Sequence, residues 1–139
     1  MNRADVMKVI ESDYGRTVFT ALGEFPPRQH QIVAFNTGQS YRQDLSAEAK
    51  LAWYAIGQGM VLRVWHDPVS CSLIDGCRCE EQIIRPDIPI SAAVAQELIA
   101  SGVLWKLTEE RIGNRTGYRE GWKDAGLDGT VADFWVCLQ

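Results

Sequence analysis

A chain of 139 residues, 46% of them hydrophobic, has the size of one globular domain and is long enough to bury a core without disulfide or metal staples. Its formal net charge of −4 excludes the overall basic surface typical of nucleic-acid-binding proteins, although it leaves room for one local basic patch. The sequence has no run of about 18 apolar residues and begins with a charged segment, so we expect neither a membrane span nor a signal peptide, and a cytoplasmic location.

The first part of the chain is predicted to be helical. Residues 4–22 carry an apolar residue at every fourth position, which predicts one amphipathic helix. Gly15 weakens its middle by about 1 kcal/mol relative to alanine. Pro26-Pro27 ends this helix, because both residues lack an N–H and a proline disfavours helical geometry in the residue before it.

Two further helices are predicted before residue 58. The first covers residues 27–36 and would stop at Gly38, although its short apolar run at 32–35 also fits a strand. A polar linker follows as far as Leu45. The next helix, at about 46–57, would begin at a capping side chain, either Asp44 or Ser46.

Strand composition begins at Met60. Residues 61–65 are rich in β-branched and aromatic side chains, Asp67-Pro68 predicts a turn, and residues 69–73 alternate between polar and apolar. Asp75-Gly76 is a strong signal for a two-residue type I′ hairpin. We therefore expect two consecutive hairpins.

The second of these hairpins would separate three cysteines. With Asp75-Gly76 as the loop, Ser72 pairs with Cys79. Because side chains alternate along a strand, Cys77 and Cys79 then share one face of the sheet and Cys71 points to the other.

These cysteines, together with His66, could form a zinc site or remain free thiols. Zinc accepts all four of its potential ligands, which are His66, Cys71, Cys77 and Cys79. Their spacing matches structural zinc sites poorly, and the predicted hairpin separates the thiols. We therefore favour free thiols and expect no metal and no cofactor, with a zinc site or a redox pair as the alternatives. Cys137 is predicted to lie in the core.

Catalytic motifs are lacking in the sequence. It contains no Gly-rich phosphate loop, no nucleophile elbow and no His-Glu-x-x-His. His66 could pair with a nearby cysteine as a nucleophile, but no neighbouring residue supports that role. The adjacent acids Glu80-Glu81 and Glu109-Glu110 are predicted to be solvated. We expect no catalytic residue and favour a protein that is not an enzyme.

The most informative stretch runs from Ile90 to Asp124. Ser91 predicts a cap for a helix over residues 92–101. Gly102 lies where a left-handed residue ends a helix, and the strand 103–107 would follow at once.

A basic turn is predicted after that strand, because the segment from Arg111 to Arg119 contains two glycines, an asparagine and no acid. Tyr118 and Trp122 would begin and end the returning strand. The positively charged residues of the turn are Arg111, Arg115 and Arg119, with Asn114 at its centre.

The segment 95–126 resembles the winged helix-turn-helix superfamily in its MarR-like form. The resemblance rests on the helix stop Ser101-Gly102-Val103-Leu104, the basic wing, the pair Tyr118-Arg119 and the exit Asp124-Ala125-Gly126. It implies DNA binding, with the helix in the major groove and the wing on the phosphate backbone.

This sequence departs from the family pattern in its helix. Residues 92–101 contain neither Lys nor Arg, and Glu97 is their only charge, which is a handicap because phosphate attraction supplies much of DNA affinity. Ser91 and Gln96 could touch base edges. The predicted binding residues are therefore Arg111, Asn114, Arg115 and Arg119 of the wing, together with Ser91 and Gln96.

We therefore expect one α+β domain, with a helical part at 1–58 and a strand-rich part at 60–139. The second part would consist of β-hairpins and a winged-helix-like C-terminal region with one helix at about 91–101. The favoured function is a regulatory, non-enzymatic module that binds nucleic acid through the wing, with a homodimer built on the N-terminal helix as one arrangement. The alternative is a protein-interaction or inhibitor module that reuses the fold, and a small Cys/His enzyme or zinc protein comes last. An ordinary hairpin with solvated arginines would also explain the wing.

Overall fold

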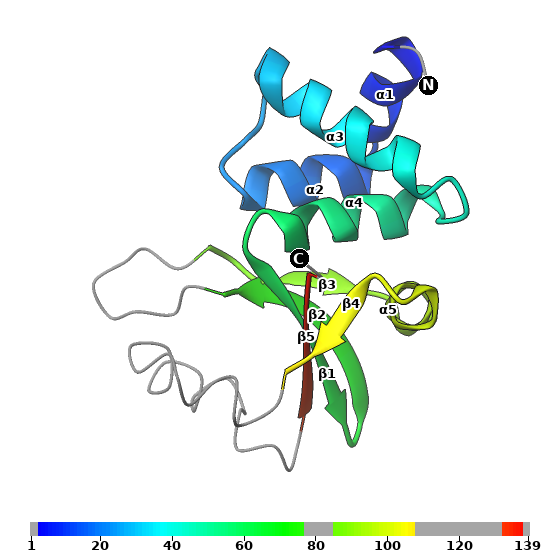
Figure 1. Ribbon diagram of the computed structural model, residues 1–139. Coiled ribbons are helices and arrows are strands. Elements are labelled where there is room, and N and C mark those ends of the chain that lie inside the picture. Colours follow the sequence, from blue (N-terminus) through cyan, green and yellow to red (C-terminus); the bar gives the residue numbers. More distant parts are fainter. Residues whose placement is uncertain (1–2, 77–84, 108–131, 138–139) are drawn as a thin grey trace.

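The computed structural model describes residues 3–76, 85–107 and 132–137. Four helices form a layer on one side of a five-stranded antiparallel sheet, and a fifth helix lies beside them (Figure 1). The chain is therefore a single α+β domain with a helical N-terminal half, as the sequence predicts. The elements are α1 (Arg3–Ile10), α2 (Asp13–Ala21), α3 (Gln29–Tyr41), α4 (Ala47–Gly57), β1 (Met60–His66), β2 (Val69–Asp75), β3 (Ile88–Ile90), α5 (Ala92–Ser101), β4 (Leu104–Lys106) and β5 (Ala132–Cys137).

The prediction of one helix over residues 4–22 is wrong, because the chain turns between α1 and α2. The Ser12 hydroxyl caps α2 by accepting a hydrogen bond from the Gly15 amide at 3.2 Å. A Cβ atom at Gly15 would collide with the carbonyl oxygens of Val9 and Ile10. The glycine that weakens a single long helix is therefore the residue that lets two short helices pack closely.

The helix predicted at 27–36 is confirmed as α3, but its predicted end is wrong. Gly38 lies inside α3, which continues to Tyr41, so the linker before α4 is shorter than expected. Glycine costs only about 1 kcal/mol inside a helix. Phe35 on the inner side of α3 is 1% exposed and packs edge-on against Phe19. This packing favours a continuous helix. Because residues 32–35 lie within α3, the strand alternative is wrong.

The helix predicted at about 46–57 is confirmed as α4, and Ser46 rather than Asp44 caps it. The Ser46 hydroxyl accepts a hydrogen bond from the Ala49 amide at 3.2 Å. Ser46 also donates its own amide and hydroxyl to the Glu97 carboxylate of α5, at 3.1 and 2.9 Å. Asp44 instead pairs with Arg42 at 2.7 Å. The single charge of α5 therefore holds α5 against the start of α4.

The helical layer has an aromatic centre. Phe19 of α2 stacks on Tyr54 of α4 at 5.1 Å between ring centroids, and Phe35 of α3 meets Tyr54 edge-on at 5.4 Å. In Figure 1, α2 and α4 run in one direction and α3 runs in the opposite direction. None of the described helices is long and apolar enough to cross a membrane.

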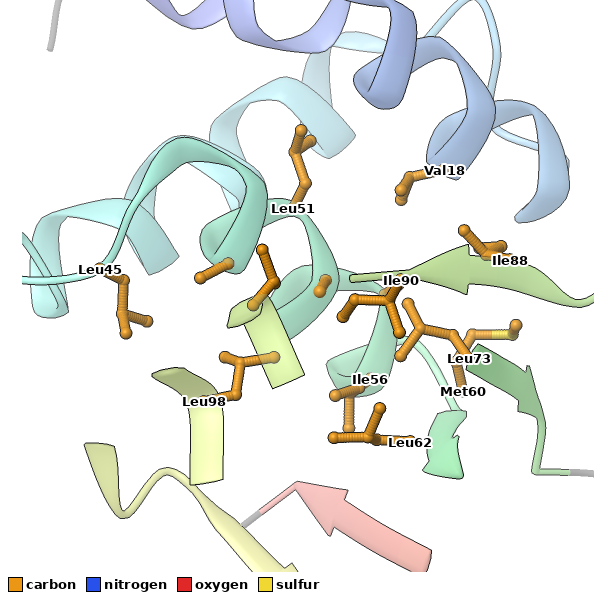
Figure 2. Close-up of a cluster of buried hydrophobic side chains, with 14 of the residues drawn as sticks. Val18, Leu45, Leu51, Ile56, Met60, Leu62, Leu73, Ile88, Ile90 and Leu98 are labelled. Carbon is orange, nitrogen blue, oxygen red and sulfur yellow. The ribbon is translucent and has the colours of Figure 1, made fainter. Parts of the chain in front are cut away.

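The strand order is β3-β2-β1-β5-β4. β1 and β2 form the predicted hairpin around Asp67-Pro68, with His66 opposite Val69. β5 lies between β1 and β4, although it comes from the C-terminal end of the chain. The main core fills the space between the sheet and the helices (Figure 2), with buried side chains that include Leu51, Ile56, Leu62, Leu73, Ile88 and Leu98.

The hairpin predicted at Asp75-Gly76 is wrong. β2 continues beside β3, and Ser72 faces Arg63 on one side and Pro89 on the other. Both sides of Ser72 are thus occupied, which excludes the predicted pairing with Cys79. Gly76 also lacks the positive φ that a type I′ turn requires.

Asp75 forms a buried ion pair instead of a turn. Its carboxylate, 3% exposed as a residue, accepts hydrogen bonds from the Arg85 backbone amide at 2.8 Å and from the Arg85 guanidinium at 3.0 Å. The same guanidinium donates to the Gln58 carbonyl oxygen at 3.0 Å. This contact ties the end of α4, the end of β2 and the approach to β3 together.

Candidate nucleic-acid interface

The segment that carries the predicted wing connects two neighbouring strands. β4 and β5 pair antiparallel, with Trp105 opposite Val136, and the Leu107 amide donates to the Phe134 carbonyl oxygen at 2.7 Å. Both ends of the connection, at residues 107 and 132, therefore lie at the same end of this strand pair. Four predicted site residues fall within the connection and outside the described residues, namely Arg111, Asn114, Arg115 and Arg119.

Three polar side chains, one each from β1, β4 and β5, form a connected chain where this connection begins and ends. Asp133 of β5 is in contact with His66 Nε2 at 3.2 Å through Oδ2 and with Lys106 Nζ at 3.3 Å through Oδ1. The side chains of His66 and Lys106 are 42% and 53% exposed. Surface pairs of this kind contribute little to stability. The exposed fractions leave both side chains accessible to a partner.

The opposite face of the sheet carries an arginine and two tryptophans. The Arg63 guanidinium lies over the Trp65 ring at 4.9 Å and reaches Asp87 at 3.4 Å. By strand pairing, Trp105 lies on this face too, and it is 40% exposed. Lys106 and Arg63 thus place one cation on each face of the sheet near the connection, and both tryptophan rings lie on the Arg63 face.

The structure places one of the other two predicted residues, Ser91, away from this region. Ser91 follows β3, and three strands stand between β3 and β4, which corresponds to roughly 19 Å. Its hydroxyl is used to cap α5 by accepting from the Val94 amide at 3.2 Å. Gln96 is exposed on α5. Ser91 and the predicted wing therefore belong to different edges of the sheet.

The local prediction for α5 is confirmed. Ser91 is its N-cap, and Gly102 ends it with a left-handed φ of 79° before β4 begins. The element that precedes α5 is the strand β3 rather than a helix. α5 buries Val94, Ala95 and Leu98, so its inner side is committed to the core.

Nucleophilic chemistry finds little support among the described groups. Burial raises the pKa of the Cys71 thiol, which disfavours the reactive thiolate. His66 contacts Asp133 of β5, on the other side of β1 from the strand that carries Cys71. Cys77 and Cys79 lie outside the described residues. Within 3–76, 85–107 and 132–137, no three His, Cys, Asp or Glu side chains could together hold a metal ion.

Cys137 was predicted to lie in the core. It is half-buried and packs against the edge of the main core.

Comparison with protein-family models, curated proteins and solved structures finds no match. The resemblance to winged helix-turn-helix proteins therefore stays a prediction from sequence.

Sequence reasoning missed the residues around the start of the connection. His66 and Lys106 come together only because β5 inserts between β1 and β4 and supplies Asp133 to both. The pairing of strands so far apart leaves no short motif. The local signal in the sequence that could have drawn attention to this edge is the tryptophan directly before a lysine, Trp105-Lys106.

Proposed function

We propose that this chain is a non-enzymatic module that binds nucleic acid through the connection between β4 and β5. The pairing of these two strands supports the proposal. It follows the order of a winged helix, in which a helix stop and a strand lead into a basic connection that returns to the neighbouring strand. The arginines Arg111, Arg115 and Arg119 lie in that connection.

The chemistry favours contacts to the phosphate backbone over base reading. Arginine binds phosphate oxygens with two parallel hydrogen bonds, and Lys106 adds a charge next to the connection. α5 has no cation, and its only charge is bound to Ser46. We therefore expect binding that depends strongly on salt and weakly on sequence. Trp105, at the same edge, offers a ring on which an unpaired base could stack.

A protein-interaction or inhibitor module is the second candidate. Two of the cations near the connection already have acidic partners, since Lys106 contacts Asp133 and Arg63 contacts Asp87. Val69 at the β1–β2 turn and Trp105 on the edge strand β4 are 65% and 40% exposed. Aromatic residues and arginine are enriched in protein interfaces, and matched charges suit a protein surface better than a polyanion.

The decisive experiment is the salt dependence of binding to short duplex and single-stranded DNA of mixed sequence, measured by fluorescence anisotropy. Replacing Arg111, Arg115 and Arg119 together by alanine should abolish most of the affinity at low salt. It should also lower the slope of log affinity against log salt by about 3, near one for each lost phosphate contact.

A matched control removes the same charge from the other side of the molecule. Arg3, Arg16 and Arg28 are exposed on the helical layer, so their joint replacement by alanine changes net charge equally and should leave the slope nearly unchanged. Equal losses in both triple variants would mean that net charge alone drives binding. No affinity of the unaltered chain for either DNA at low salt would refute the proposal and favour the protein partner.

A further inference from the structure

The outer side of α3 is an exposed stripe of residues spaced three or four positions apart. Such a spacing places side chains in one row along a helix. Val33 and Tyr41 within this row are 52% and 77% exposed, and they account for two of the four large hydrophobic side chains that are exposed in the described part of the chain. The row, called the α3 stripe below, consists of His30, Val33, Ala34, Thr37 and Tyr41.

The α3 stripe lies on a helix without charged residues. No Lys, Arg, Asp or Glu occurs among the thirteen residues of α3, in a chain of which 23% is charged. Surface helices normally turn a charged or polar face to water. The inner side of α3 already buries Ile32 and Phe35, so this helix presents apolar side chains both inward and outward.

We propose that the α3 stripe is the contact between two copies of this chain, packed antiparallel about a two-fold axis. Such an axis near Thr37 sets Val33 of one copy against Tyr41 of the other, and the reverse. Ala34 beside the axis lets the two helices approach closely. An isologous contact of this kind needs a surface complementary to itself, and a neutral stripe with a large side chain at each end meets that condition.

The charges at the ends of α3 agree with a second copy as the occupant. Antiparallel packing brings the Arg28 end of one helix beside the end of the other, where Arg42 is already neutralised by Asp44 at 2.7 Å. Arg28 therefore meets no unbalanced positive charge. Two copies that each carry a charge of −4 can approach at a neutral stripe with little repulsion. A nucleic acid would find no Lys or Arg within the stripe.

This contact is separate from the proposed nucleic-acid interface. In Figure 1, α3 lies on the side of the helical layer away from the sheet, whereas β4 and β5 meet their connection at the far end of the sheet. A dimer through α3 therefore leaves the connection ends of β4 and β5 uncovered in both copies. Loss of one property does not require loss of the other.

Sedimentation equilibrium of the full chain tests the proposal. We expect a mass that rises from 15.6 kDa towards twice that value with concentration. Tyr41→Glu and Val33→Glu should each weaken association at least tenfold, because a carboxylate would be buried at the contact. Val69→Glu adds the same charge at another exposed apolar position and should leave association unchanged. Circular dichroism confirms that each variant is folded.

Cysteine crosslinking tests the position of the axis. Thr37→Cys should form an intermolecular disulfide under mild oxidation, whereas Thr17→Cys should not exceed the unaltered chain. The two threonines are matched, because each is exposed and donates its hydroxyl to the carbonyl oxygen four residues earlier, at 2.8 and 3.0 Å. A monomer at concentrations up to roughly 1 mM would overturn the proposal, as would a dimer that Tyr41→Glu and Val33→Glu leave intact.

Discussion

The helical layer and the sheet differ in whether their buried polar side chains have partners. In and around the sheet, charged side chains that are buried or half-buried meet partners from other elements, as Asp75 meets Arg85 and Arg63 meets Asp87. In the helical layer, the hydroxyl of Tyr14 and the side-chain amide of Gln39 are buried without a hydrogen-bond partner among the described residues. Polar pairs thus help to specify the sheet, whereas the helical layer combines pairs such as Tyr54–Glu24 with buried polar groups that have no partner among the described residues.

The two buried polar groups lie at one end of the aromatic centre. Tyr14 precedes Phe19 on α2, and the negative charge of Glu48 near the start of α4 reaches it. Gln39 lies one turn beyond Phe35 on α3, which runs antiparallel to α2. Both groups therefore lie towards the start of α4. A buried polar group without a partner costs about 1–3 kcal/mol, so this end of the layer can be improved by substitution.

The largest effect is expected from breaking the pair at the sheet. Arg85→Ala leaves the Asp75 carboxylate buried with fewer partners, and we expect a loss of about 3 kcal/mol in the free energy of unfolding. Urea denaturation measures it. Arg42→Ala is the control, because its partner Asp44 is largely exposed and the loss should be clearly smaller. Equal losses would show that burial does not distinguish the two pairs.

A gain in stability is expected from the helical layer. Gln39→Met keeps the length of the side chain and removes an amide that is 4% exposed and lacks a partner among the described residues, so we expect a gain of about 1–2 kcal/mol. Gln31→Met on the same helix is the control. The Gln31 side chain accepts a hydrogen bond from the Arg28 amide at 2.7 Å, and its loss should destabilise the protein. Destabilisation by Gln39→Met would mean that the amide is satisfied.

The smallest effect compares two tyrosines at neutral pH. Tyr14→Phe should raise the free energy of unfolding by about 1 kcal/mol, because the buried hydroxyl has no partner in the described part of the chain. Tyr54→Phe should lower it by a similar amount, because its hydroxyl donates to Glu24 at 2.7 Å. Effects of the same sign would contradict the contrast between these sites.

The Tyr14 substitution also has a pH signature. Burial, and then the charge of Glu48, raise the pKa of Tyr14 from 10.0 to about 12. The folded state therefore favours the protonated phenol, and this contribution is complete below pH 10 and is lost as the pH rises from about 10 to about 12. Unfolding measured across that range should show a larger gain from Tyr14→Phe than at neutral pH. A gain that does not change with pH would show that Tyr14 titrates normally.

Much of the local structure was predictable because its signals act within a few residues. Ser91 caps α5, Gly102 ends it, and Asp67-Pro68 turns β1 into β2, each as predicted. Ser46, one of the two predicted caps, begins α4. One error came where a local signal competed with tertiary packing. Periodicity favoured one helix across Gly15, but the close packing of α1 on α2 separated it into two.

The sequence by itself determined the class of the domain, the positions of α3, α4 and α5, the β1–β2 hairpin, and the three arginines that follow β4. These follow from periodicity, capping and turn residues, whose effects are short-ranged. Only the tertiary structure decided that β5 enters the sheet between β1 and β4, that Asp75 pairs with Arg85 rather than forming a turn, and that Ser91 lies far from the connection. Strand pairing over long separations is set by burial of the whole sheet face, which no local motif records.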